Sequence, residues 1–247
     1  MTGRTVAIIQ ARMGSERLPG KVLLDIGGQT MLERVVRRVQ RSSLIDEVIV
    51  ATTMVRDDDA IVNECRALGV SVVRGSAHDV LDRYRQAALA SGATTCVRVC
   101  ADSPLVDPSI CDLVVWSLIG ADPPADYAGN KIDPSLPLGL DVEAFSIDAL
   151  ERAWTEARND YERAHVTMYM YANPELFRLV GVSSEVDRHD WRWTVDMPED
   201  LEFVRQIYAR LGDANDFTWD DVVALIEREP GLALINAHLQ SKAVTAG

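Results

Sequence analysis

The sequence predicts an α/β fold built on a doubly wound, mostly parallel sheet, with a less regular segment inserted on the substrate side. Strand-like apolar runs alternate with helical patterns through the first 120 residues, and this rhythm stops near Gly120. A loop rich in glycines and cations follows the first apolar run directly. In open α/β sheets ligands bind at the carboxyl ends of the strands, which is where this loop begins.

The first strand, Val6–Ile9, leads into a loop that ends at Lys21. Its glycines allow a ligand close to the backbone, and Arg12, Arg17 and Lys21 add three positive charges, so we expect a cradle for a polyphosphate. The loop is not a P-loop, because five residues separate its two glycines and Val22 follows the lysine, and it contains no G-x-G-x-x-G. A solvated basic loop is the alternative.

Capping residues and apolar periodicity predict the other elements. Thr30 and Glu33 form a capping box that opens the first helix, Asp57 can cap the second, and Gly69 should end it. Further elements of the first half are strands at 47–52, 71–74 and 96–100 and a helix at 79–91. The second half should contain strands at 140–145, 177–182 and 192–195, and helices at 147–157, 162–172, 198–211 and after a cap at Thr218. Residues 242–247 should be frayed.

Length and charge limit the possible classes of protein. The 247 residues fit a single domain, 1–247, with a phosphate-binding half at about 1–120, an insertion at about 121–190 and a return to the sheet at about 191–240. A net charge of −13 argues against a nucleic-acid partner, while the cations of the first loop still suit a small anion. We expect no membrane segment, no signal peptide and a cytoplasmic location. The four cysteines lack metal-site spacing and should be buried free thiols.

Two carboxylates follow predicted strands. Asp102 could hold Mg²⁺ against a triphosphate, because Mg²⁺ is usually bound by one or two carboxylates and by phosphate oxygens. Alternatively, Asp102 only organises the turn that follows. Asp196 ends another predicted strand and could equally be a helix N-cap, and Glu199 and Asp200 fit the first turn of a helix for structural reasons.

The pattern Q-A-R-M-G-S-x-R-L-P-G-K at residues 10–21 resembles the nucleotide-binding loop of the acidic-sugar cytidylyltransferases. These are the CMP-Kdo and CMP-sialic acid synthetase relatives, and the resemblance is greatest to the SpsF-type spore-coat polysaccharide proteins. It implies a nucleotide-diphospho-sugar transferase-like, Rossmann-like fold and a loop that wraps the triphosphate of CTP. The implied nucleotide contacts are Gln10, Ala11, Arg12, Met13, Gly14, Ser15, Arg17, Lys21, Thr52, Arg74, Ser76, Arg98, Cys100, Ala101 and Asp102.

The resemblance extends to segments at 102–105, 139–145, 162–167 and 195–201. It implies that Asp102 and Asp196 hold Mg²⁺, that Arg12 and Lys21 act with them in catalysis, and that the protein is a homodimer active in polysaccharide biosynthesis. The implied acceptor contacts are Asp141, Glu143, Arg163, His165 and Arg192. Asp141 and Glu143 could instead form the polar face of an edge strand, and Arg163 and His165 could belong to a structural helix start.

The sequence departs from the family pattern at three positions. Cys100 stands where the CMP-Kdo enzymes often have a glutamine that helps to hold the base, and Ala101 replaces a glycine. Ala164 stands where the SpsF-type proteins usually have a glutamate. The recognition of the base and the identity of the acceptor are therefore the open points of this resemblance.

Together these observations predict an enzyme that transfers CMP from CTP to a small anionic acceptor, with Mg²⁺ as cofactor. An acidic sugar is the first expectation, and a phosphonate or a sugar phosphate is possible. A glycosyltransferase of related fold is an alternative, because Asp57-Asp58-Asp59 spells D-x-D, although acidic residues also suit a helix start. A non-catalytic protein that binds CTP without releasing pyrophosphate is a third possibility.

Overall fold

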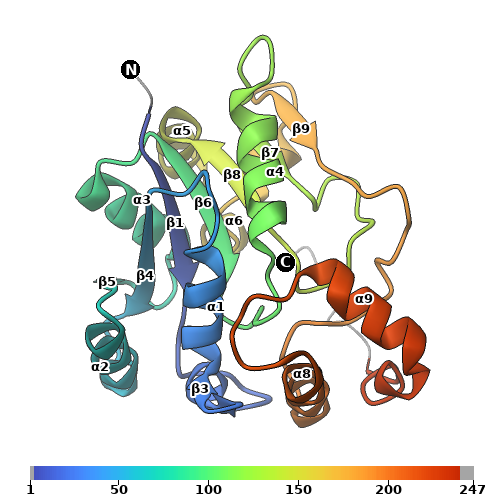
Figure 1. Cartoon of the computed structure of the whole chain (residues 1–247). Coiled ribbons are helices and arrows are strands. Elements are labelled where there is room, and N and C mark those ends of the chain that lie inside the picture. Colours follow the sequence, from blue (N-terminus) through green and yellow to red (C-terminus); the bar gives the residue numbers. More distant parts are fainter. Residues whose placement is uncertain (1–2, 240–247) are drawn as a thin grey trace.

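A seven-stranded sheet forms the centre of the computed structural model, which describes residues 3–239 (Figure 1). The strands lie in the order β5 (Ser71–Gly75), β4 (Glu47–Thr53), β1 (Thr5–Gln10), β6 (Thr95–Cys100), β8 (Glu143–Ser146), β7 (Tyr127–Gly129) and β9 (Leu179–Gly181). Only β8 runs antiparallel to its neighbours. The predicted mostly parallel sheet is therefore confirmed.

Helices cover both faces of this sheet (Figure 1). In chain order they are α1 (Met31–Val39), α2 (Asp59–Leu68), α3 (Val80–Ser91), α4 (Pro108–Ile119), α5 (Ile147–Glu156), α6 (Asp160–Ala164), α7 (Met168–Ala172), α8 (Pro198–Leu211) and α9 (Trp219–Arg228). Short 3₁₀ turns lie at η1 (Lys21–Leu23), η2 (Arg56–Asp58) and η3 (Pro230–Leu232), and a separate hairpin joins β2 (Asp25–Ile26) to β3 (Gln29–Thr30).

Successive residues of β1 belong to two different cores. Val6 and Ile8 pack in the core under α3 and α5, whereas Ala7 and Ile9 pack in the core under α1, α4 and α8. All four side chains have no exposed surface. A parallel strand that is buried on both faces needs an apolar residue at every position, which explains the continuous apolar run.

Most of the predicted helix ends are confirmed. Thr30 accepts a hydrogen bond from the Glu33 amide at 3.0 Å, although the Glu33 carboxylate pairs with Arg37 and does not complete the capping box. Gly69 and Gly92 end α2 and α3 in the left-handed conformation that glycine adopts most readily.

Three predicted strands or helices are wrong in part. The strand expected at 140–145 begins only at Glu143, and the one expected at 192–195 is an isolated bridge between Leu138 and Arg192. The helix expected at 162–172 is two short helices, because Val166 between them has a φ of 58°, which a β-branched residue rarely adopts. Apolar periodicity does not register such a break.

Asp57 is not the cap of the second helix. That helix begins at Asp59, and the preceding Asp58 makes no side-chain capping bond. The Asp58 carboxylate is used elsewhere, because it accepts a hydrogen bond from the Met13 amide at 2.7 Å and another from the Thr53 hydroxyl. Asp58 therefore ties the first loop to the end of β4. Of the two residues that a D-x-D motif would use, Asp59 already pairs with Arg74 at 2.6 Å, so the spelling gains no support as a metal motif.

The aromatic residues of the insertion are mostly internal. Phe145 is fully buried and Phe177 is 4% exposed, whereas Tyr169 and Tyr171 are half-buried. Three of the four free cysteines are buried as predicted, and Cys100 is half-buried. Among residues 3–239, no helix has both the length and the apolar character that a membrane span requires. The fraying predicted for 242–247 lies outside the described residues.

Candidate functional site

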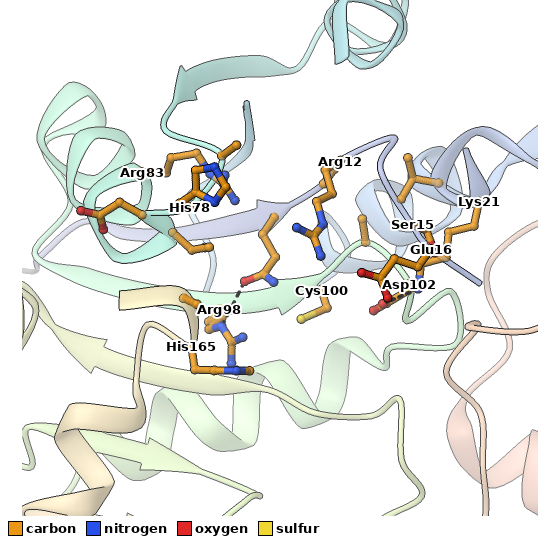
Figure 2. Close-up of a pocket in the computed structure, with 18 of the residues that line it drawn as sticks. Arg12, Ser15, Glu16, Lys21, His78, Arg83, Arg98, Cys100, Asp102 and His165 are labelled. Carbon is orange, nitrogen blue, oxygen red and sulfur yellow. Dashed lines mark hydrogen bonds and ion pairs between the residues drawn. The ribbon is translucent and has the colours of Figure 1, made fainter. Parts of the chain in front are cut away.

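A cavity of about 660 Å³ lies at the carboxyl ends of β1 and β6, on the sheet face that α3 covers. Figure 2 shows Lys21, Ser15 and Asp102 together at one end and Arg83 with His78 at the opposite end. Arg98 and His165 form a third side. The predicted first loop thus lines a real cavity at the expected edge of the sheet.

Backbone hydrogen bonds fix the shape of the first loop. The amides of Ser15 and Gly20 both donate to the Met13 carbonyl, at 2.8 and 2.9 Å. Gly20 has a φ of 70°, a conformation that most other residues would adopt only with strain. Arg12 lines the cavity and makes no hydrogen bond or ion pair with any of residues 3–239. An anionic ligand would supply the partner that this guanidinium lacks.

Lys21 lies between the two predicted metal ligands. Its Nζ is 2.8 Å from Asp102 Oδ2, 2.8 Å from Asp196 Oδ1 and 2.7 Å from the Val195 carbonyl. Burial alone would lower the pKa of Lys21, but the two carboxylates raise it above its ordinary value. Arg17 pairs with the other oxygen of Asp196 at 2.7 Å. Burial would raise the pKa of Asp196, but these cations hold it below its ordinary value.

The donor set fits a magnesium ion that is shared with a triphosphate. Asp102 and Asp196 direct one oxygen each to the same point, where Lys21 Nζ now lies, and both carboxylates are partly exposed to the cavity. Among residues 3–239 no cluster of three or more metal-binding side chains occurs, so the protein alone offers two carboxylates. Mg²⁺ commonly takes one or two carboxylates and completes its shell with phosphate oxygens and water.

Arg192 positions Asp196 and does not line the cavity. Its guanidinium donates to Asp200 Oδ1 at 2.8 Å and to Asp196 Oδ2 at 3.2 Å. Asp200 also accepts the amides of Asp196 and Met197, both at 3.0 Å, as part of the α8 capping box. The structural role predicted for Asp200 is confirmed. The N-cap is Met197, so the alternative role of Asp196 as a cap is wrong.

Glu143 is the centre of a buried network and does not reach the cavity. Cross-strand register places it beside Arg98, to which it is hydrogen-bonded. Glu143 Oε1 also accepts hydrogen bonds from the Tyr127 hydroxyl at 2.8 Å and from the Thr167 hydroxyl at 2.6 Å. Because β8 lies between β6 and β7, the edge-strand alternative is wrong. The prediction of Glu143 as an acceptor contact is also not supported, since its side chain is 2% exposed and fully paired.

The ion pair between Glu143 and Arg98 shifts the pKa values of both groups. Burial would raise the pKa of Glu143, but Arg98 above all, with Lys131, lowers it to about 2. Burial would lower the pKa of Arg98, but Glu143 raises it well above its ordinary value. Both groups are therefore charged at neutral pH, and the ion pair holds the Arg98 guanidinium in place at the cavity wall.

Replacing Glu143 by glutamine is expected to lower the free energy of unfolding at pH 7 by about 3–5 kcal/mol, because Arg98 would then be a buried charge without its counter-ion. The difference between the wild-type protein and this variant should shrink as the pH falls from about 4.3, the pKa of an unfolded glutamate, toward about 2. Urea unfolding at pH 7, 4 and 3 measures both effects.

The control is Glu47→Gln, which removes the exposed ion pair with Arg4 and should cost less than about 1 kcal/mol. A loss for Glu143→Gln no larger than for this control would contradict the assignment of a buried ion pair. A difference that does not change with pH would contradict the lowered pKa of Glu143.

Thr52 and Arg74 do not line the cavity, although both were expected to contact the nucleotide. Gln10 pairs in register with Ala51, so the adjacent Thr52 and its partner Arg74 face the opposite side of the sheet. Arg74 donates to Asp59 Oδ1 at 2.6 Å and to a β4 carbonyl. Alternation along the strands therefore gives both residues a structural position.

Other expected nucleotide contacts differ in their position relative to the cavity. Those that line it are Gln10, Ala11, Arg12, Ser15, Arg17, Lys21, Arg98, Cys100, Ala101 and Asp102. Met13 and Gly14 do not line the cavity, and the Met13 carbonyl fixes the loop by accepting the two amide hydrogen bonds described above. Ser76 also lies outside the lining, and its hydroxyl accepts hydrogen bonds from the amides of His78 and Asp79.

Of the residues expected to contact the acceptor, some line the cavity and others do not. Arg163 and His165 line the cavity, but Arg163 is held by an ion pair to Asp79 at 2.7 Å and by two backbone carbonyls. Burial, Arg98 and Lys131 together lower the pKa of His165. Asp141 lies before β8 rather than on it, outside the lining, and its carboxylate accepts the Gly139 amide at 3.3 Å.

Arg83 and His78 line the cavity although the sequence analysis did not select them. A signal for Arg83 was available in the spacing of the α3 helix. It occupies a position of the buried stripe that Val80, Tyr84 and Ala87 define, where a charged residue is unusual. Arg83 is only 3% exposed.

Comparisons with known proteins agree with this geometry. A family model described as cytidylyltransferase matches residues 6–220. The spore coat polysaccharide biosynthesis protein SpsF of Bacillus subtilis is 31% identical over 233 residues, which cover 92% of this chain and 95% of that protein. A 3-deoxy-manno-octulosonate cytidylyltransferase of Geobacter sulfurreducens is 40% identical over 126 residues, about half of each chain.

A solved structure supports the same grouping. A cytidylyltransferase from Leptospira borgpetersenii superposes with a TM-score of 0.90 at 31% sequence identity, covering 97% of this chain and 99% of that one. The resemblance noted in the first loop therefore extends over nearly the whole chain.

Proposed function

We propose, on the premise that the chain belongs to the cytidylyltransferase family, that it transfers CMP from CTP to a small anionic acceptor and releases pyrophosphate. The protein is a CTP-dependent nucleotidyltransferase. An acidic sugar is the acceptor we propose first, and a phosphonate or a sugar phosphate would fit the same charge. The observation that carries the proposal is the convergence of Asp102, Asp196 and Lys21 beside a cation-lined loop.

The proposed reaction is an in-line displacement at the α-phosphorus of CTP. An oxygen of the acceptor forms the new bond to phosphorus, and the bond to the bridging oxygen of the pyrophosphate breaks. Arg12, Arg17 and Lys21 would stabilise the charge of the triphosphate and of the leaving pyrophosphate. No covalent enzyme intermediate is required, so catalysis is mainly positioning and electrostatic stabilisation.

Asp102 and Asp196 are the residues that would hold Mg²⁺. When bound, the metal supplies positive charge for the α-phosphate and lowers the pKa of the attacking hydroxyl. Arg192 and Arg17 keep Asp196 ionised and oriented toward Asp102. In the absence of the metal, Lys21 neutralises the same two carboxylates.

The acceptor is proposed to bind on the side of Arg98 and His165. Both line the cavity, and Asp102 lies just after β6, the strand that contains Arg98. The positive potential of Arg98 and Lys131, which helps to lower the pKa of His165, would favour an acceptor with a negative charge. We also propose a homodimer, by resemblance to related synthetases, and light scattering would test it.

Pyrophosphate release tests the proposed function directly. The protein is incubated with Mg²⁺, each of the four nucleoside triphosphates and a panel of acidic sugars, sugar phosphates and phosphonates. We expect release with CTP and with one class of anionic acceptor only. Release with neutral acceptors alone would contradict the anionic acceptor, and absence of any effect of CTP on turnover or melting temperature would contradict the nucleotide site.

A further inference from the structure

Arg83 is a buried cation with one side of its guanidinium unused. Its Nη1 donates to the Ser76 carbonyl at 2.6 Å. Its Nε is buried without a hydrogen-bond partner, and Nη2 makes no hydrogen bond within residues 3–239. Nε and Nη2 form the lateral edge of the guanidinium, which presents two parallel N–H donors. Leaving such donors unpaired in a buried position is costly unless a ligand completes them.

The protein supplies no anion for this edge. The nearest carboxylate on the same helix start, Asp79, is paired with Arg163 at 2.7 Å. Asp58 is occupied by the Met13 amide and by threonine hydroxyls of β4. Burial lowers the pKa of Arg83 and Arg12 adds to that effect, while Asp58 and Asp79 offset only part of it from a distance. Of the arginines that line the cavity, Arg12 and Arg83 therefore form no ion pair with a carboxylate of residues 3–239.

The backbone at Gly75 makes room for the Arg83 side chain. A Cβ atom at Gly75 would lie 2.7 Å from Arg83 Cγ, closer than carbon atoms can approach. Gly75 has no such atom, so the aliphatic part of Arg83 packs directly against the end of β5. The position of Arg83 in the cavity therefore depends on a glycine at residue 75, and this gives a second way to move it.

The location of Arg83 assigns its ligand. On the proposed function, the end of the cavity with Lys21 and Asp102 takes the triphosphate, and the side with Arg98 takes the acceptor (Figure 2). The third part of the cavity, at the start of α3, is then available for the base. Ala77 and Val80 line this part beside Arg83 and provide the apolar surface that a flat ring requires.

The donor pattern of Arg83 matches cytosine and opposes uracil. Cytosine presents two adjacent acceptors, O2 and N3, to a pair of parallel donors. In uracil N3 carries a hydrogen and is itself a donor, so one of the two bonds is replaced by a repulsion. We propose that Arg83 binds O2 and N3 of cytosine and thereby makes the enzyme prefer CTP to UTP. The departure at Cys100 then leaves base recognition to a residue on another element.

The test measures nucleotide binding, which needs no knowledge of the acceptor. Dissociation constants for CTP, UTP and tripolyphosphate are determined by calorimetry with Mg²⁺ for the wild-type protein and for Arg83→Lys. Lysine keeps the positive charge and a donor for the Ser76 carbonyl but lacks the paired donors. We expect the preference for CTP over UTP to fall by about 5- to 150-fold, with little change in the affinity for tripolyphosphate.

Two further variants make the result specific. Arg85→Lys is the matched control, because Arg85 lies on the same helix, pairs with Glu151 and does not line the cavity. It should leave the preference unchanged. Gly75→Ala keeps Arg83 but displaces it, and should lower the preference for CTP as Arg83→Lys does.

Three results would overturn the assignment. An unchanged preference for CTP in Arg83→Lys would show that another residue reads the base. A parallel loss of tripolyphosphate affinity would make Arg83 a phosphate contact. Failure of the folded wild-type protein to bind any of the three ligands would reject the nucleotide site itself, and with it both the proposed function and this assignment.

Discussion

Replacing Asp196 by asparagine is expected to lower kcat roughly 1000-fold, because the uncharged amide would no longer hold Mg²⁺ at the α-phosphate. Asparagine keeps the shape of the side chain but only one oxygen acceptor, so it can accept from Lys21 or from Arg17 and not from both. The melting temperature should fall only moderately while turnover is lost, because Lys21 keeps its pair with Asp102 and Arg192 keeps its pair with Asp200. Asp102→Asn should have an effect of the same size, since its carboxylate converges on the same point.

The combined variant gives a sharper result than either single one. If Asp102 and Asp196 hold one metal ion together, removing the first already removes the function of the second. The double variant should then be only slightly slower than each single variant, far from the product of the two losses. A fully multiplicative loss would mean that the two carboxylates act independently.

Asp148→Asn is a suitable control, because Asp148 is an exposed residue in the first turn of α5 and does not line the cavity. It should keep wild-type turnover. If either active-site variant keeps more than about one-tenth of the wild-type kcat at saturating Mg²⁺, that carboxylate is not a metal ligand. Mn²⁺ binding in the presence of CTP, followed by electron paramagnetic resonance, would give an independent measure of the same loss.

Much of the first half of the fold could be predicted because its signals are local. Apolar runs such as Val6–Ile9 mark strands that are buried on both faces, and Gly69 and Gly92 mark helix ends through a backbone conformation. The same pattern predicted which edge of the sheet holds the site, since loops at the carboxyl ends of parallel strands meet at one edge. The loop and Asp102 were placed correctly on that basis.

The remainder depends on contacts that no local pattern records. Asp196 reaches Asp102 because the Val195 amide donates to the Asp102 carbonyl at 2.8 Å, a contact between distant parts of the chain. The predicted role of Glu143 was not supported for the opposite reason. A carboxylate in a short strand is normally interpreted as an exposed polar group. Only the antiparallel register of β8 beside β6 shows that Glu143 faces Arg98.

Sequence reasoning also selected charged residues by type and could not tell which of them already have partners. Arg74 and Arg192 were expected to contact ligands, yet Asp59 and Asp200 bind their guanidinium groups. Arg83 was missed because it occupies a core position of an amphipathic helix, where the apolar neighbours dominate the pattern. The distinction between paired and unpaired cations requires the tertiary structure, and the ligand contacts proposed for Arg12 and Arg83 rest on this distinction.

Lys21→Met is expected to produce two large effects of opposite sign. Catalytic efficiency with CTP, kcat/KM, should fall roughly 100- to 1000-fold, because a cation that faces the triphosphate is lost. Binding of Mn²⁺ in the absence of nucleotide should become at least about tenfold tighter, because Nζ no longer neutralises Asp102 and Asp196 at 2.8 Å from each. A structural defect alone would weaken both properties, so the gain in metal affinity is the decisive measurement.

Arg17→Gln provides the comparison for this experiment. Arg17 also pairs with Asp196, at 2.7 Å, but its side chain is 34% exposed, against 9% for Lys21, and it does not contact Asp102. Its removal should leave Mn²⁺ affinity without nucleotide nearly unchanged, because Lys21 still bridges the two carboxylates. If Lys21→Met and Arg17→Gln behave alike, Lys21 does not compete with the metal. If only Lys21→Met gains affinity, this lysine must leave the two carboxylates when CTP and the metal bind together.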